Sequence, residues 1–280
     1  MNRLTAEQVR RNLAGRDRWQ GFEGHRRRVT ELLTGTARSA ADRLCVLGAG
    51  NANDIDLGEL TTAFAEVHLV DLDAEALDFG LLRQQPAMRD RIHLHRQVDV
   101  TGAWDLLAAW SPEALPTPDE IDRCIERVTR FAGPALPAPF DAAASVCLVS
   151  QLVEGAVAAL GHNHPCLLEL ILAIRMSHLR MLVQLVRPGG RGLLVTDFVS
   201  SDTVPGLADA SEQALPALAG QLLEAGNFFH GLNPQVLHRV FTADPLIGPL
   251  IEESRLHGPW RWDLGPRMYL VAAIEFTRRW

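Results

Sequence analysis

Short apolar runs alternate with amphipathic stretches along the first part of the chain. Apolar residues fill 44–47, they occupy 67–70 except for His68, and an alternating apolar run follows at 92–94. Such runs indicate buried strands, whereas apolar residues at helical spacing in 57–64 and 77–81 indicate helices between them. A repeated strand, helix, strand order predicts a parallel sheet with helices on its faces.

Further apolar runs extend this sheet toward the C-terminus. The runs 140–149 and 192–195 predict a fourth and a fifth strand, and the long apolar stretch 166–186 between them predicts a helix. Two more strands are expected near 260–262 and at 268–276. Because only a short turn separates these last two, they should pair as an antiparallel hairpin.

Three segments add to the predicted sheet. Residues 1–40 form an N-terminal extension of two short helices. The stretch 111–139 carries six prolines around one plausible helix at 118–131, which predicts a rigid surface insertion. The stretch 201–253 predicts a second, mostly helical insertion. A length of 280 residues and 47% hydrophobic residues fit one domain, 1–280, with these additions.

Charge and apolar content exclude several classes of protein. The net charge of -7 argues against a nucleic-acid partner, because polyanion binding needs a basic surface. The long apolar stretch 166–186 contains too many polar residues to span a membrane, and the N-terminus lacks the apolar core of a signal peptide. The four cysteines lack the spacing of a metal or disulfide motif. We therefore expect a cytoplasmic protein without disulfides.

A glycine turn follows the first predicted strand. Gly48 and Gly50 allow backbone to approach a ligand closely, and Asn53 or Asp54 can cap the next helix. The second strand ends at Asp71, where an acid can accept hydrogen bonds from ribose hydroxyls. The two features together predict an adenosine-containing cofactor.

Two kinds of cofactor then compete, a dinucleotide and S-adenosylmethionine. The dinucleotide motif needs a third small residue at position 53, next to the pyrophosphate, but the chain has Asn53. A cofactor without phosphate needs no such clearance. S-adenosylmethionine is therefore favoured, and an NAD-dependent oxidoreductase is the less favoured alternative.

The segment 187–197 carries a resemblance to a known family. A Pro188-Gly189-Gly190 turn joins the long helix to a fifth strand that ends at Thr196-Asp197. This order resembles the class I S-adenosylmethionine-dependent methyltransferases over roughly 40–200 and the C-terminal strands. The resemblance implies an α/β fold with a doubly wound, Rossmann-like, seven-stranded, mostly parallel sheet and an antiparallel last strand. It also implies S-adenosylmethionine as the cofactor.

The resemblance also implies which residues hold this cofactor. They lie in the glycine turn, at the ends of the second and third strands and after the fourth: Gly48, Ala49, Gly50, Asn53, Asp54, Asp71, Leu72, Asp99, Val100, Ser150 and Gln151. The chain departs from the family at Val46, where an acid is common. Asp54 or Asp56 is expected to replace that acid near the amino group of the cofactor.

Three residues are candidates for catalysis. Asp197 ends the fifth strand, at the edge where ligands of parallel sheets collect, although it could also cap a turn. His162 could be a base, or with His164 a metal ligand, or simply part of a turn before a helix. His230 follows Phe228, in a segment that could line an acceptor pocket or pack in the core. We expect no metal ion.

These observations predict methyl transfer to the nitrogen or oxygen of a small molecule. The transfer is an in-line displacement, so alignment of the acceptor matters more than a general base. The insertions 111–139 and 201–253 are expected to cover the acceptor site. Alternatives are a protein methyltransferase and a cofactor-binding scaffold without activity. The sequence indicates neither the acceptor nor the oligomeric state.

Overall fold

Seven strands form one sheet in the order β3-β2-β1-β4-β5-β7-β6 in a computed structural model that describes all of residues 1–280. The strands are β1 (Arg43–Leu47), β2 (Glu66–Asp71), β3 (Ile92–Arg96), β4 (Phe140–Val146), β5 (Val186–Ser200), β6 (Ile251–Asp263) and β7 (Met268–Arg278). The first five are parallel, and β7 lies antiparallel between β5 and β6. The predicted fold class is confirmed.

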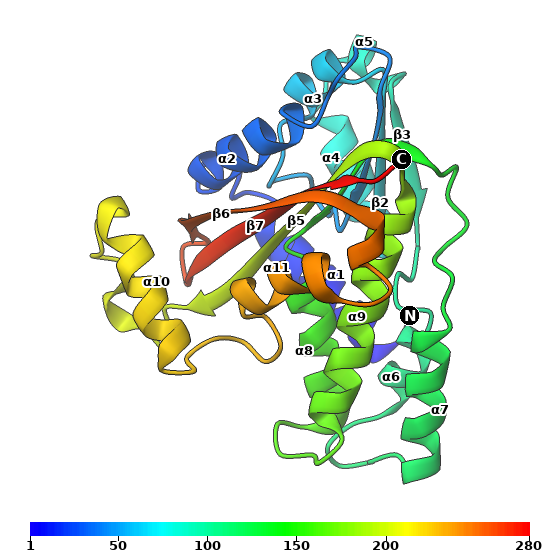
Figure 1. The fold of residues 1–280 in the computed structure, drawn as a ribbon, viewed down its shortest axis with the longest axis vertical. Helices are drawn as coiled ribbons and strands as arrows, with labels where there is room; N and C mark the ends of the chain where they lie inside the picture. Colours follow the sequence, from blue (N-terminus) through cyan, green and yellow to red (C-terminus); the bar gives the residue numbers. More distant parts are fainter.

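Helices cover both faces of this sheet (Figure 1). They are α1 (Arg3–Gly15), α2 (Glu23–Thr34), α3 (Leu57–Ala63), α4 (Ala74–Leu82), α5 (Pro86–Arg89), α6 (Trp104–Ala109), α7 (Pro118–Thr129), α8 (Val149–Leu160), α9 (Leu167–Leu185), α10 (Leu215–Glu224) and α11 (Pro234–Ala243). None of them is both long enough and apolar enough to cross a bilayer. All four cysteines are free thiols.

Alternation along the strands creates two hydrophobic cores. In β1, Leu44 and Val46 face the core that α2, α3 and α4 cover, whereas Cys45 and Leu47 face the core formed with α6 to α9 and α11. Successive side chains of a strand point to opposite faces, so a fully apolar strand must be covered on both. This accounts for the continuous apolar runs of the parallel strands.

The prediction of a surface insertion at 111–139 does not hold for its helix. In α7, Ile121, Cys124 and Val128 are buried in the larger core and pack toward α9. Pro118 stands in the first turn of α7, where a missing N–H costs nothing, and Thr117 forms a capping box with Glu120. The prolines therefore mark the ends of a core helix.

Two boundaries near the expected site differ from the prediction. Strand β4 ends at Val146, and the chain turns at Cys147, whose φ is 46°. Ser150 therefore lies in the first turn of α8 rather than at a strand end. The cap of the helix after the glycine turn is Asp56, which accepts from two backbone N–H groups, and not Asn53 or Asp54.

Candidate functional site

A cavity of about 790 Å³ opens at the carboxyl edge of the parallel strands, where ligands of such sheets bind. Most of the residues predicted from the sequence line it: Gly48, Gly50, Asn53, Asp54, Asp71, Ser150, Gln151, His162, Asp197 and His230. Its volume is in the range of about 300–1,000 Å³ that small-molecule sites usually have. The cavity thus joins predicted residues from six separate segments of the chain, 48–54, 71, 150–151, 162, 197 and 230.

The glycine turn forms the floor of one end of this cavity. Gly48 and Gly50 have φ values of 75° and 47°, in the left-handed region that glycine tolerates. The N–H of Gly50 donates to Oδ2 of Asp71 at 2.8 Å, which ties the turn to the end of β2. The N–H groups of Gly48 and Ala49 both donate to the carbonyl of Val70. Ala49, which was also predicted to hold the cofactor, is buried and does not line this cavity.

Asp71 keeps hydrogen-bonding capacity for a ligand. Its Oδ1 accepts from the N–H of Asp73 at 2.8 Å and its Oδ2 from Gly50, so each oxygen retains one lone pair. Burial raises the pKa of Asp71 to about 6, and the two backbone donors oppose that rise. At pH 7 the group is therefore still mostly ionised and can accept from two hydroxyls.

A smaller cavity adjoins the glycine turn, and it is lined by Leu72, Asp99 and Val100, three of the residues predicted to hold the cofactor. The Asp99 carboxylate is largely used within its own loop. Oδ1 accepts from the N–H and the hydroxyl of Thr101, and Oδ2 accepts from the N–H of Trp104 at 3.0 Å. One lone pair of Oδ2 remains for a contact with a base.

Both polar atoms of the Asn53 side chain are hydrogen-bonded to other residues of the protein. Its side-chain NH₂ donates to the carbonyl of Gly15 at 2.8 Å, and its oxygen accepts from Arg83 at 2.8 Å. Asn51 likewise donates to the carbonyl of Asn12 at 2.6 Å. The two asparagines hold the end of α1 against the glycine turn. These hydrogen bonds explain why position 53 carries an asparagine and not the small residue of a dinucleotide motif.

Asp54 and Asp56 were the two candidates to replace the acid missing at Val46. Asp54 lines the cavity, whereas Asp56 caps α3. One oxygen of Asp54 lies 3.2 Å from Nε2 of the buried His25. Nδ1 of His25 accepts from the indole N–H of Trp260 at 3.1 Å, so the proton of a neutral ring is on Nε2, facing Asp54.

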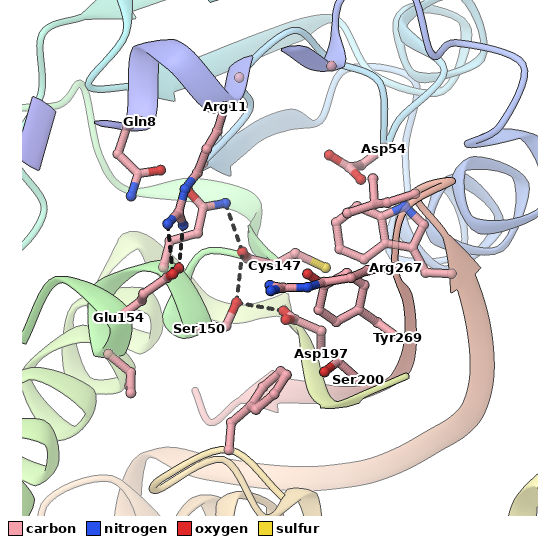
Figure 2. A pocket seen from close by; sticks show the side chains of 18 of the residues that line it. Gln8, Arg11, Asp54, Cys147, Ser150, Glu154, Asp197, Ser200, Arg267 and Tyr269 are labelled. Carbon is pink, nitrogen blue, oxygen red and sulfur yellow. Dashed lines mark hydrogen bonds and ion pairs between the residues drawn. The ribbon is translucent and has the colours of Figure 1, made fainter. Parts of the chain in front are cut away.

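Asp197 lies at the other end of the cavity, between Ser150 and Tyr269 (Figure 2). The hydroxyl of Ser150 donates to its Oδ1 at 2.6 Å. Burial raises the pKa of Asp197 to about 6, with the Ser150 hydrogen bond opposing the rise. A carboxylate with this pKa can accept a proton near neutral pH.

The two predicted histidine segments meet at this end. The rings of His162 and His230 have centroids 6.3 Å apart, and both residues line the cavity with Phe228 and Phe229. His164 does not join them, because its Nδ1 accepts from the N–H of Cys166 before α9. No residue of 111–139 lines the cavity, so that segment is not a cover for it.

Sequence reasoning missed several lining residues. Gln8, Arg11 and Asn12 of α1 close one side, and Arg11 forms a bidentate ion pair with Glu154 of α8. Aromatic side chains form the opposite wall: Phe22, Trp262 and Tyr269. The sequence contained one signal for this wall. Trp260 and Trp262 are two positions apart in a predicted strand, so both side chains lie on the same face of the sheet.

The residues that could hold a metal ion lie elsewhere. Glu66 and His68 of β2 and His93 of β3 bring ligand atoms within 4.8 Å of one another. Nε of Arg43 already donates to Glu66 at 2.8 Å, so a cation occupies the anionic end of this group. His162 and His164 belong to no such group.

No protein-family model matches the chain, and no curated protein matches it. Among solved structures, it is similar to the YcgJ protein of Bacillus subtilis at 12% identity, over 91% of this chain and 99% of that chain, with a TM-score of 0.46. It is also similar to the magnesium protoporphyrin IX methyltransferase of Synechocystis PCC 6803 at 11% identity, over 92% and 83%, with a TM-score of 0.46. An rRNA methylase of Streptococcus thermophilus matches at 12% identity, over 90% and 95%, with a TM-score of 0.44. The strand order and the pairing register of this chain establish its fold.

Proposed function

We propose that this protein is an S-adenosylmethionine-dependent methyltransferase that acts on a small molecule. One observation carries the proposal: a single cavity joins the Gly48–Gly50 turn and Asp71 at one end to Asp197 at the other. The first end has in Asp71 an acceptor that suits the ribose of an adenosine, and the second has a buried acid next to polar and aromatic side chains. The sheet has the seven strands and the antiparallel last strand that the resemblance to class I methyltransferases implied.

The residues at the first end of the cavity each bind a different part of the cofactor. Asp71 accepts from the two ribose hydroxyls, while Leu72, Asp99 and Val100 surround the adenine beside the glycine turn. Asp54 accepts from the ammonium group with Oδ1, which is buried and has no hydrogen-bond partner in the protein. Ser150 and Gln151 would hold the part of the cofactor that carries the methyl group, and the Gln151 side chain donates to the carbonyl of Cys147 at 3.0 Å.

The bound cofactor supplies an activated methyl group on a sulfonium. The protein then has to align an acceptor with that methyl and exclude water. Asp197 is the group placed to hold or remove a proton on the acceptor, and His162 and His230 are further candidates at the same end. Helix α1 closes the side of the cavity through the Arg11–Glu154 pair, which favours a small acceptor over a protein segment.

Calorimetry with S-adenosylhomocysteine and with NAD tests the proposal. We expect binding of the first and no response to the second. Binding of NAD alone would instead support the oxidoreductase. Transfer of label from S-adenosylmethionine to any acceptor would distinguish an enzyme from a scaffold, and labelling of proteins but not of small molecules would support the protein methyltransferase.

A further inference from the structure

The charges around the cavity are unequal. Five acidic side chains line it against three arginines. Two of the acids are neutralised, because Arg11 pairs with Glu154 and Nε of Arg267 pairs with Asp202 at 2.7 Å. Arg18 donates to a backbone carbonyl and is paired with no acid. Both ion pairs are solvent-exposed, so they form the rim rather than the interior.

Three acids remain without a cationic partner, namely Asp54, Asp71 and Asp197. Under the proposed function, Asp71 binds ribose and Asp54 binds the ammonium of the cofactor. Asp197 is then the one left for the acceptor. It is 5% exposed, and its only side-chain partner is the neutral hydroxyl of Ser150. A buried carboxylate without a cation is costly, and a bound cation would remove that cost.

Aromatic rings form a continuous wall of the same cavity. Phe22 meets the ring of Trp262 edge-on at 5.4 Å, Trp262 lies 5.4 Å from Tyr269, and Tyr269 lies 6.3 Å from Phe229. All four residues line the cavity. Tyr269 of this wall lies beside Asp197 (Figure 2). Burial raises the pKa of Tyr269, a hydrogen bond with Arg267 opposes that rise, and the charge of Asp197 adds to it. Aromatic faces attract organic cations, and most strongly where water is excluded.

We infer that the acceptor is an organic amine, bound as a cation between the Phe22–Trp262–Tyr269–Phe229 wall and the carboxylate of Asp197. This inference rests on the proposed function and specifies its substrate class. A carboxylate acceptor would be repelled by Asp197, and a neutral hydroxyl would leave the acid without a counter-charge. Only a cation uses both features of this end of the cavity.

The transfer step balances with this assignment. Asp197 takes one proton from the ammonium and becomes a neutral carboxylic acid. The freed nitrogen lone pair forms a bond to the methyl carbon as the carbon–sulfur bond breaks, and the electron pair of that bond stays on sulfur. The products are a methylated ammonium and S-adenosylhomocysteine.

Ligand-detected NMR titration with two matched probes, benzylamine and benzyl alcohol, tests the inference at pH 7.5. The protein is first saturated with S-adenosylhomocysteine, so the cofactor end is filled and cannot bind the amine. Its affinity for S-adenosylhomocysteine is measured separately, so failure of the proposed function is seen on its own. We expect benzylamine to bind about tenfold or more tightly than benzyl alcohol.

Variants test which residues cause the preference for benzylamine over benzyl alcohol. Asp197→Asn should abolish it and leave S-adenosylhomocysteine affinity unchanged, and Trp262→Leu should reduce it. Glu252→Gln removes an equal charge from an exposed position on β6 and should change neither value. Equal affinity for the two probes, no binding of benzylamine, or a preference that survives in Asp197→Asn would overturn the inference.

Discussion

The hydroxyl of Ser150 donates to the carboxylate of Asp197 at 2.6 Å, joining the first turn of α8 to β5, which continues past the predicted end at Asp197 to Ser200. The two residues are 47 positions apart in the chain. Because the Ser150 hydroxyl donates this hydrogen bond and keeps its proton, the ionised Asp197 remains a pure acceptor toward the cavity. A neutral hydrogen bond of this kind orients the carboxylate without neutralising it.

Replacement of Asp197 by asparagine should stabilise the protein near neutral pH. Burial raises the folded-state pKa of Asp197 from 3.8 to about 6, so the folded state binds more protons between these values and loses stability as pH rises through them. At 1.36 kcal/mol per pKa unit, Asp197→Asn should gain on the order of 3 kcal/mol at pH 7.5 and little at pH 3.5. Urea unfolding at both pH values measures this. A less stable variant at pH 7.5 would contradict the assigned burial cost.

Removal of the Asp71 carboxylate should weaken binding of S-adenosylhomocysteine by about tenfold or more. Hydrogen bonds to a charged acceptor contribute roughly 1.5–3 kcal/mol. Calorimetry of Asp71→Ala measures the loss, and Asp78→Asn is the matched control, since Asp78 is an exposed acid that pairs with Arg96. Equal affinity in wild type and Asp71→Ala would remove Asp71 from the site.

A side chain in the glycine turn should block binding before it unfolds the protein. At Gly50, with φ of 47°, a Cβ would approach Oδ1 of Asn12 to 3.2 Å. The backbone strain of roughly 1–2 kcal/mol is small beside a typical folding stability of about 5–15 kcal/mol. Gly50→Val should therefore lose S-adenosylhomocysteine binding and keep near-native far-UV circular dichroism. At Gly24 an added Cβ meets nothing within 4 Å, so Gly24→Ala should preserve both. Parallel loss of binding and of ellipticity in Gly50→Val would indicate a packing role only.

Loss of the Asn53 side chain should loosen α1. The bonds from Asn53 to Gly15 and from Arg83 to Asn53 are the ones removed, at roughly 1–2 kcal/mol. Hydrogen exchange should rise in residues 3–15 of Asn53→Ala and stay unchanged in β1 and β4. Asn227→Ala is the control, because Asn227 makes one long hydrogen bond of 3.4 Å, to Thr203. Unchanged exchange in α1 would mean that other contacts hold the helix.

The parts of the site that local sequence patterns determine could be predicted. Gly48 and Gly50 follow an apolar strand, and Asp71 ends the next one, so the fixed geometry of a strand, turn, helix unit brings them together. The positions of the parallel strands along the chain followed from apolar runs that both faces of the sheet bury, whereas the arrangement of the seven strands was implied by the family resemblance. Asp197 could be placed because all parallel strands end at the same edge.

Features that depend on contacts distant in sequence could not be predicted. Phe22 and Trp262 meet through packing of α2 on β6, and no spacing in the chain announces that contact. Helix α7 looked like a surface addition because its flanking prolines obscured the buried spacing of Ile121, Cys124 and Val128. The role of Asn53 depends on where α1 ends.

The position of β7 has a consequence for how the chain is made. This strand is the last element, yet it lies between β5 and β6. Until Met268–Arg278 has left the ribosome, the outer edge of β5 has no partner, and an unpaired apolar strand edge promotes association between chains. The glycine turn and Asp71 can form early in synthesis, whereas the wall that contains Trp262 and Tyr269 forms only at its end. A chain that stops before Met268 should therefore contain the cofactor end of the cavity and aggregate through β5.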